Sequence, residues 1–174
     1  MTALLLVLAL AADAKEEGFT PLFNGKDLSG WQIAANKDKD KGGDALDKKT
    51  ESPTKRYVVK DGTLVIDPAV KGDMVLLTEK KFEKDAHIKF EFKPGKGCNN
   101  DLYFRGLKFD INPDQVKPIK LDEWNTLEIV AKGEEAEVKV NGESVKKFKL
   151  KGTSQFGIRA EFGPIEIKNV RVKE

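Results

Sequence analysis

Acidic, basic and phenolic side chains lie close together in several strand-like segments of this 174-residue sequence. A carboxylate can serve as a general base or a proton donor, a guanidinium can stabilise a developing oxyanion, and a phenol can donate a proton. The residues concerned are Glu91, Asp101, Tyr103, Arg105, Arg159 and Glu161. Acids, cations and an aromatic ring on one surface suit a sugar ligand, so these residues are candidates for a catalytic or substrate-binding site.

Alternation within each segment predicts the face that these side chains take. Glu91 alternates with Phe90 and Phe92, so it must point away from the apolar face of its strand. The other candidates that alternate with apolar neighbours are Tyr103, Arg105, Arg159 and Glu161. If the strands share one sheet, we expect these side chains to share one polar face. The same pattern also fits cross-strand ion pairs on a solvated sheet, each contributing roughly 0.2–1 kcal/mol.

Trp31 and Trp124 are the two indole side chains, and each lies beside polar residues. An indole can stack on a sugar ring or fill one end of a core. The sequence leaves both interpretations open for each residue, and Trp124 is kept as a candidate for substrate binding.

His87 and Cys98 are the only residues of their types, and neither belongs to a recognisable catalytic set. A Ser-His-Asp triad needs an acid and a nucleophile around the histidine, and no Gly-x-Ser-x-Gly motif is present. One histidine excludes a multi-histidine zinc site, and one cysteine excludes an internal disulfide. Acidic residues alternate between residues 36 and 47, but Lys41 stands where an EF-hand loop needs glycine, so we expect no calcium site.

Short segments with period-two alternation, which must position these residues, follow one another from residue 57 onward. Asp61-Gly62 and Asn141-Gly142 separate pairs of such segments, and both dipeptides suit the two-residue loop of a β-hairpin. Glycine and proline recur between the segments, and no helical stripe competes with the alternation. The pattern predicts an all-β fold, an antiparallel jelly-roll β-sandwich.

Composition supports one domain, expected over residues 15–174. Hydrophobic residues make up 39% and charged residues 34%, and ten phenylalanines can build a core. The net charge is +2 with the two signs interleaved, which is unlike the basic stripe of a nucleic-acid binder. No apolar stretch approaches the length of about 18 residues that a membrane-spanning helix needs. Residues 36–56 are dense in lysine and aspartate, so we expect a charged surface loop there.

The first fourteen residues form a separate unit. An apolar run ends at Ala12-Asp13-Ala14, and charged residues follow at once. This layout predicts a signal peptide over residues 1–14 that is cleaved near Ala14, and hence a secreted or periplasmic protein. The other interpretation is a buried N-terminal strand or helix.

Five blocks of sequence carry a resemblance to a known family. Residues 18–31 read Gly-Phe-Thr-Pro-Leu-Phe-Asn-Gly-Lys-Asp-Leu-Ser-Gly-Trp. The others are residues 61–64, 99–106, 123–129 and 165–172. Together the blocks resemble the 3-keto-disaccharide hydrolase domain family over residues 18–173. The resemblance implies a concanavalin-like sandwich, usually secreted or lipid-anchored, that cleaves glycosides oxidised at C3.

This chemistry assigns roles to the candidates. A ketone at C3 acidifies the hydrogen at C2, and once a base removes it, the group at C1 can leave by β-elimination. The resemblance and the expected shared face make Glu91 the base and Arg105 the stabiliser of the enolate oxygen. Tyr103 or Glu161 would donate the proton to the leaving oxygen. The substrate-binding candidates are Asp101, Arg159 and Trp124.

The sequence departs from the family pattern at three places. Asn99-Asn100-Asp101 stands where the family commonly has Asn-Ser-Gly, residues 160–163 replace a Gln-x-His-Gly segment, and no Tyr-Glu-x-Gln strand is present. A second hypothesis is therefore a sandwich that binds a carbohydrate or a protein without catalysis. The sequence predicts no cofactor, leaves a divalent metal requirement open, and does not define the oligomeric state.

Overall fold

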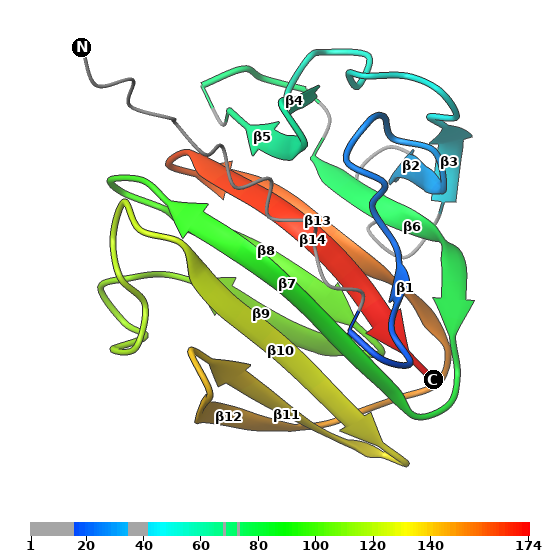
Figure 1. Cartoon of the computed structure of the whole chain (residues 1–174), viewed down its shortest axis with the longest axis vertical. Helices are drawn as coiled ribbons and strands as arrows, with labels where there is room; N and C mark the ends of the chain where they lie inside the picture. Colours follow the sequence, from blue (N-terminus) through cyan, green and yellow to red (C-terminus); the bar gives the residue numbers. More distant parts are fainter. Residues whose placement is uncertain (1–15, 35–41, 68, 73) are drawn as a thin grey trace, which may run out of the picture.

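The computed structural model describes residues 16–34, 42–67, 69–72 and 74–174, and its regular elements there are all β-strands (Figure 1). The strands form two antiparallel sheets. The eight-stranded sheet has the order β12 (Glu143–Lys149), β11 (Glu135–Val140), β10 (Asn125–Lys132), β7 (Ala86–Pro94), β14 (Ile165–Lys173), β5 (Thr63–Ile66) and β4 (Tyr57–Lys60), with β1 (Thr20–Pro21) also paired to β14. The six-stranded sheet has the order β3 (Gly42–Ala45), β2 (Trp31–Ala34), β6 (Val75–Phe82), β13 (Ser154–Phe162), β8 (Asn99–Phe104) and β9 (Leu107–Ile111).

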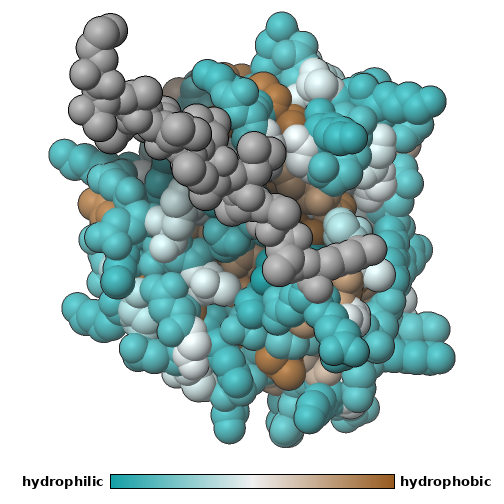
Figure 2. Space-filling model, viewed as in Figure 1, coloured by the Kyte–Doolittle hydropathy of each residue, from teal (hydrophilic) through white to brown (hydrophobic). Residues whose placement is uncertain are grey.

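The core lies between the two sheets, and the predicted alternation fills it. From the eight-stranded sheet Ile88, Phe90 and Phe92 of β7 are fully buried. Phe156 and Ile158 of β13 meet them from the six-stranded sheet, within the same cluster of apolar side chains. The all-β sandwich is thus confirmed. The face of the molecule seen in Figure 1 is mostly hydrophilic, with only small separate apolar areas (Figure 2).

Both predicted hairpin loops are confirmed. Asp61 and Gly62 connect β4 to β5, and Asn141 and Gly142 connect β11 to β12. All four residues have positive φ, between 49° and 83°. Two successive residues with positive φ match the twist of the flanking strands, which is why Asp-Gly and Asn-Gly serve here.

Trp31 and part of the segment 36–56 belong to the core. Trp31 is fully buried, and its indole N–H donates to the carbonyl oxygen of Leu22 at 2.8 Å, so this tryptophan fills the core. Within the expected surface loop of residues 36–56, the described part contains strand β3 and a fully buried Leu46. This segment is therefore anchored to the core and does not lie wholly on the surface.

Two further sequence expectations concern membrane and export. In the described part of the chain, no helix is long and apolar enough to cross a membrane. The predicted signal peptide, residues 1–14, lies outside the described residues.

Replacing Tyr57 with Phe is expected to lower the free energy of unfolding by about 2 kcal/mol. The Tyr57 hydroxyl accepts a hydrogen bond from the backbone N–H of Ala160 and lies 2.9 Å from the carbonyl oxygens of Met74 and Ile158. Phe fills the same space but leaves the N–H of Ala160 with only its 3.1 Å bond to the carbonyl oxygen of Met74, and removes the hydroxyl from the buried carbonyl oxygen of Ile158. Urea denaturation of the two proteins measures the difference, and a loss below roughly 0.5 kcal/mol would contradict this account.

Candidate functional site

Three neighbouring strands of the six-stranded sheet bring charged side chains together on its outer face. Arg159 of β13 lies opposite Asp101 of β8, and Asp101 lies opposite Asp110 of β9. Ile158 and Leu102, which alternate with them, point into the core. The outer network, as this group is called below, consists of Asp101, Tyr103, Lys108, Asp110, Arg159 and Glu161.

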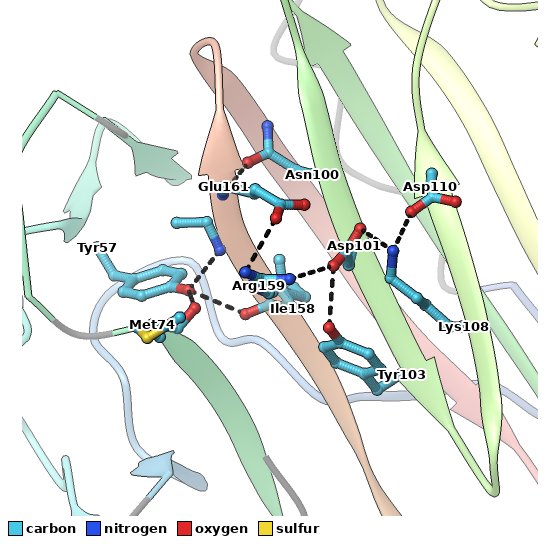
Figure 3. A network of polar contacts seen from close by, with 11 residues as sticks. Tyr57, Met74, Asn100, Asp101, Tyr103, Lys108, Asp110, Ile158, Arg159 and Glu161 are labelled. Carbon is cyan, nitrogen blue, oxygen red and sulfur yellow. Dashed lines mark hydrogen bonds and ion pairs between the residues drawn. The ribbon is translucent and has the colours of Figure 1, made fainter. Parts of the chain in front are cut away.

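Asp101 is the centre of the outer network (Figure 3). Its Oδ2 atom accepts hydrogen bonds from the hydroxyl of Tyr103 at 2.9 Å and from Nη1 of Arg159 at 3.0 Å. Its Oδ1 atom lies 3.2 Å from Nζ of Lys108, which also pairs with Asp110. The Asp101 side chain is fully buried and holds its partly exposed cationic neighbours, Arg159 and Lys108, from beneath.

Arg159 and Glu161 form a partly exposed pair within the outer network, beside the more exposed Lys108 and Asp110. Nη2 of Arg159 lies 2.9 Å from Oε1 of Glu161, and their side chains are 25% and 21% exposed. An exposed carboxylate beside a guanidinium can accept a proton next to a developing negative charge, which is the arrangement that enolate chemistry needs.

A β-bulge in β13 places Glu161. Arg159 pairs with Asp101 and Phe162 pairs with Asn99, so two residues of β13 lie opposite one residue of β8. The side chain of Asn100 replaces the missing ladder bond, because its Oδ1 accepts from the backbone N–H of Glu161 at 2.8 Å. Bulges are frequent beside functional sites, where they redirect a side chain.

Burial and charge pairing shift the pKa values of the network. Burial, together with the hydrogen bond donated to Asp101, raises the pKa of the Tyr103 hydroxyl. Hydrogen bonding to Asp110 and Asp101 raises the pKa of Lys108. The hydrogen bonding that Asp110 shares with Asp101 and with Lys108 lowers the pKa of Asp110. Tyr103 and Lys108 therefore stay protonated, and Asp110 stays ionised, at neutral pH.

An apolar cluster adjoins the network on the same outer face. Ala34, Val75, Leu77 and Tyr103 pack together there, and each is at most 9% exposed. Gly157 leaves room for this packing, since a Cβ atom at that position would lie 2.8 Å from the Leu77 side chain. Apolar neighbours lower the local dielectric, which strengthens the charge interactions beside them.

One buried oxygen atom on β8, Oδ1 of Asn99, lacks a hydrogen-bond donor within the described residues. Unsatisfied acceptors are costly, and they complement a ligand that brings hydroxyl groups.

Glu91 and Trp124 lie on the opposite side of the molecule, so the expectation of one face shared by all candidates is wrong for Glu91. Glu91 belongs to β7 of the eight-stranded sheet, and its carboxylate is bound by Asn169 at 2.8 Å and paired with Lys168 at 3.4 Å. Nζ of Lys168 also lies 4.2 Å from the ring centroid of Trp124. Alternation along a strand fixes which residues point outward, but it does not identify the sheet.

Arg105 does not join the outer network either. It begins the turn between β8 and β9 with a φ of 45°, and its side chain donates to the carbonyl oxygens of Gly152 at 2.8 Å and Lys84 at 3.2 Å. The guanidinium, only 6% exposed, thus joins three chain segments. The guanidinium that lies beside Glu161 is that of Arg159.

Lys108 and Asp110 are the residues of the network that the sequence interpretation missed. They follow the Arg105-Gly106 turn and alternate with Leu107, Phe109 and Ile111, so the pattern of a second hairpin strand could have identified them. The structure places β9 there as the edge strand of the six-stranded sheet.

The remaining chemical groups lie apart from the network. Cys98 is 2% exposed, and burial raises the pKa of its thiol to about 11. His87 pairs with Glu128 on the outer side of the eight-stranded sheet. Among the described residues, no three His, Cys, Asp or Glu side chains are grouped so that they could hold a metal ion.

Comparison with known proteins identifies a family. Residues 18–117 and 108–173 match the sequence model of the 3-keto-alpha-glucoside-1,2-lyase-like domain, which covers nearly all of the chain. No curated protein sequence matches the chain.

Solved structures share the fold at low sequence identity. A putative glycosyl hydrolase from Parabacteroides distasonis ATCC 8503 superimposes with a TM-score of 0.68 at 19% identity, covering 90% of this chain and 94% of that one. A laminarinase from Flavobacterium sp. UMI-01 gives a TM-score of 0.55 at 14% identity, over 88% of this chain and 98% of the other. The carbohydrate-binding module CBM66 from Bacillus subtilis gives 0.50 at 14% identity, over 84% and 97%.

Proposed function

The chain belongs to the family of 3-keto-alpha-glucoside-1,2-lyase-like domains, and from this premise we propose that it cleaves glycosides oxidised at C3. The proposal places the reaction on the outer face of the six-stranded sheet. The observation that carries it is the contact between the partly exposed Glu161 carboxylate and Arg159, which buried Asp101 holds from below.

The reaction is a β-elimination. The C3 ketone makes the hydrogen at C2 acidic, and its removal leaves an enolate with negative charge on the C3 oxygen. The C1–O bond then breaks as a C1–C2 double bond forms, and the departing oxygen takes up a proton. Charge develops on one oxygen atom, so a fixed cation near that atom lowers the barrier.

The residues of the outer network match these steps. Glu161 takes the proton from C2 and returns it to the departing oxygen. Arg159 stabilises the enolate oxygen, with Lys108 adding a second positive charge nearby. Tyr103 keeps Asp101 hydrogen bonded, and Asp101 fixes the orientation of Arg159.

A non-catalytic carbohydrate-binding sandwich is the second candidate function. One observation favours it: Arg159 binds both Asp101 and Glu161, so the carboxylate proposed as the base is already paired. An ion pair of this kind can serve recognition of hydroxyl groups without proton transfer.

Incubation with 3-keto-trehalose and with a nitrophenyl 3-keto-glucoside separates the two candidates, in the presence and absence of divalent metal. Product release from the keto sugars, and none from their unoxidised counterparts, supports the enzyme. Binding without release supports the second candidate, and the absence of both contradicts this assignment of function.

Export is part of the same proposal. The apolar N-terminal run and the Ala12-Asp13-Ala14 sequence support cleavage of a signal peptide and a site of action outside the cytoplasm. N-terminal sequencing of the expressed protein tests this, with Lys15 expected as the first residue. A chain that retains residues 1–14 contradicts it.

A further inference from the structure

A cavity of about 590 Å³ lies on the outer side of the eight-stranded sheet, away from the outer network. Pro21 contributes exposed apolar surface to its lining, together with the edges of the nearly buried Phe19 and Phe23. Glu91, Asn169 and Arg171 contribute an acceptor, an amide and a guanidinium. Apolar walls with a few convergent polar groups are typical of small-ligand sites, and the volume suits one or two sugar rings.

A second β-bulge builds this cavity. Lys168 pairs with Glu91 and Arg171 pairs with Lys89, so Asn169 and Val170 together lie opposite one residue of β7. Asn169 has a φ of 54°, a left-handed conformation that asparagine tolerates better than most residues. As a result its side-chain amide points along the sheet surface to Glu91, where Nδ2 donates to Oε1 at 2.8 Å.

The N-terminal segment forms the other wall. The carbonyl oxygen of Val170, freed from the strand ladder by the bulge, accepts the backbone N–H groups of Leu22 at 2.8 Å and Phe23 at 3.1 Å. Strand β1 lies beside β14 (Figure 1) and pairs with Arg171 and Val172, so this wall is fixed to the sheet at the bulge and just after it. The cavity is therefore formed by backbone hydrogen bonds and not only by surface side chains.

The charged residues that line the cavity balance in sign, with Glu16 and Glu91 against Lys26 and Arg171. Glu91 faces Lys168 at 3.4 Å, and Arg171 donates two hydrogen bonds to Glu16, at 2.8 and 3.1 Å. An ionic ligand would leave one of these charges without its partner. A neutral ligand with several hydroxyl groups can donate to Glu91 and accept from Asn169 while both ion pairs persist.

We propose that this cavity is a second ligand site that binds a neutral sugar, on the face opposite the proposed catalytic one. The bulge at Asn169 and Val170 is the feature that creates it. The inference does not depend on the proposed function, because none of its residues belongs to the outer network.

Two-dimensional ¹⁵N NMR of the whole protein, titrated with unoxidised trehalose and maltose, tests the proposal. We expect shifts at the backbone amides of Gly25, Gly62 and Asn169, which line the cavity. Asn169→Gly keeps the left-handed backbone but removes the amide, and Glu91→Gln keeps the shape but removes the charge. Each variant should weaken binding about tenfold, or about 1.4 kcal/mol, because Asn169→Gly loses a donor and Glu91→Gln replaces a charged acceptor with a weaker neutral one.

Glu137→Gln is the matched control, since it removes a carboxylate from the same sheet at strand β11, outside the cavity. Its binding should equal that of the wild type. The proposal is overturned if neither sugar shifts the three amides, or if the shifts persist unchanged in both cavity variants. Tighter binding of gluconate or glucosamine than of the neutral sugars also contradicts it. Cleavage of keto sugars is measured separately from binding in the cavity. The proposed enzymatic function and the proposed second sugar site can therefore each fail without the other.

Discussion

Replacing Glu161 with Gln is expected to slow cleavage of a 3-keto-glycoside roughly 100-fold or more, because the amide cannot take the proton from C2. Gln retains an oxygen that can accept the hydrogen bond from Arg159. The backbone N–H of residue 161 also keeps its bond to Asn100. The variant should therefore unfold at nearly the same urea concentration as the wild type.

The rate of nitrophenol release under single-turnover conditions is the appropriate measurement. Glu166→Gln is a matched control, because Glu166 also sits on an outer face and pairs with a cation, Lys93, at 2.8 Å, but in the eight-stranded sheet. It should retain full activity. Full activity in Glu161→Gln would contradict this assignment, and loss of activity in Glu91→Gln alone would restore the sequence-based choice of Glu91 as the base.

Replacing Asp101 with Ala is expected to lower the free energy of unfolding by about 3 kcal/mol. The Asp101 carboxylate is the fully buried partner of Arg159, Lys108 and Tyr103. Without it, two cations lie beside each other with no shared anion, and the Tyr103 hydroxyl loses its acceptor. Removal of one partner from a buried charged cluster is strongly destabilising for this reason.

Urea denaturation with a constant m-value measures this loss. Asp101→Asn keeps one oxygen acceptor for Tyr103 and Arg159, so its loss should be smaller than that of the alanine variant. Equal stability of the wild type and the alanine variant would mean that the outer network is a set of independent surface ion pairs.

Strands such as β7 and β10 were predictable because each has one buried face. The sequence around Phe90 and Phe92 alternates strictly, and these two side chains are fully buried as expected. The two-residue loops were equally predictable, since Asp61-Gly62 and Asn141-Gly142 are among the few pairs that accept positive φ at both positions.

The membership of each strand in a sheet could not be obtained in the same way. Glu91 and Glu161 alternate alike with apolar neighbours, yet β7 and β13 lie in different sheets. Pairing between strands distant in sequence depends on how the two layers pack, and the alternation within one strand contains no information about it. Tyr103, Arg159 and Glu161 thus share one face of the six-stranded sheet, whereas Glu91 lies in the other sheet.

The sequence analysis did not predict that Arg105 lies in a turn, for a related reason. It continues the alternation of Tyr103, but the chain reverses at Arg105 and Gly106, where both residues have positive φ. A side chain at a turn leaves the face of the strand, so its guanidinium reaches backbone carbonyls at the end of the sandwich instead.

Both candidate sites lie at β-bulges whose sequence signals are weak. The bulge at Ala160 and Glu161 relies on Asn100 for its missing ladder bond, and the bulge at Asn169 and Val170 relies on the N-terminal segment. In each case the compensating group comes from a distant part of the chain. Only the three-dimensional structure brings the two together.

The most direct test of the central claim is to locate where a keto sugar binds, using a 3-keto C-glucoside whose C1–C bond cannot be eliminated. This account predicts that the ligand shifts the backbone NMR signals of Tyr103, Gly157 and Glu161 on the six-stranded sheet. Shifts confined to the eight-stranded sheet around Glu91 would contradict it, as would no binding to either face.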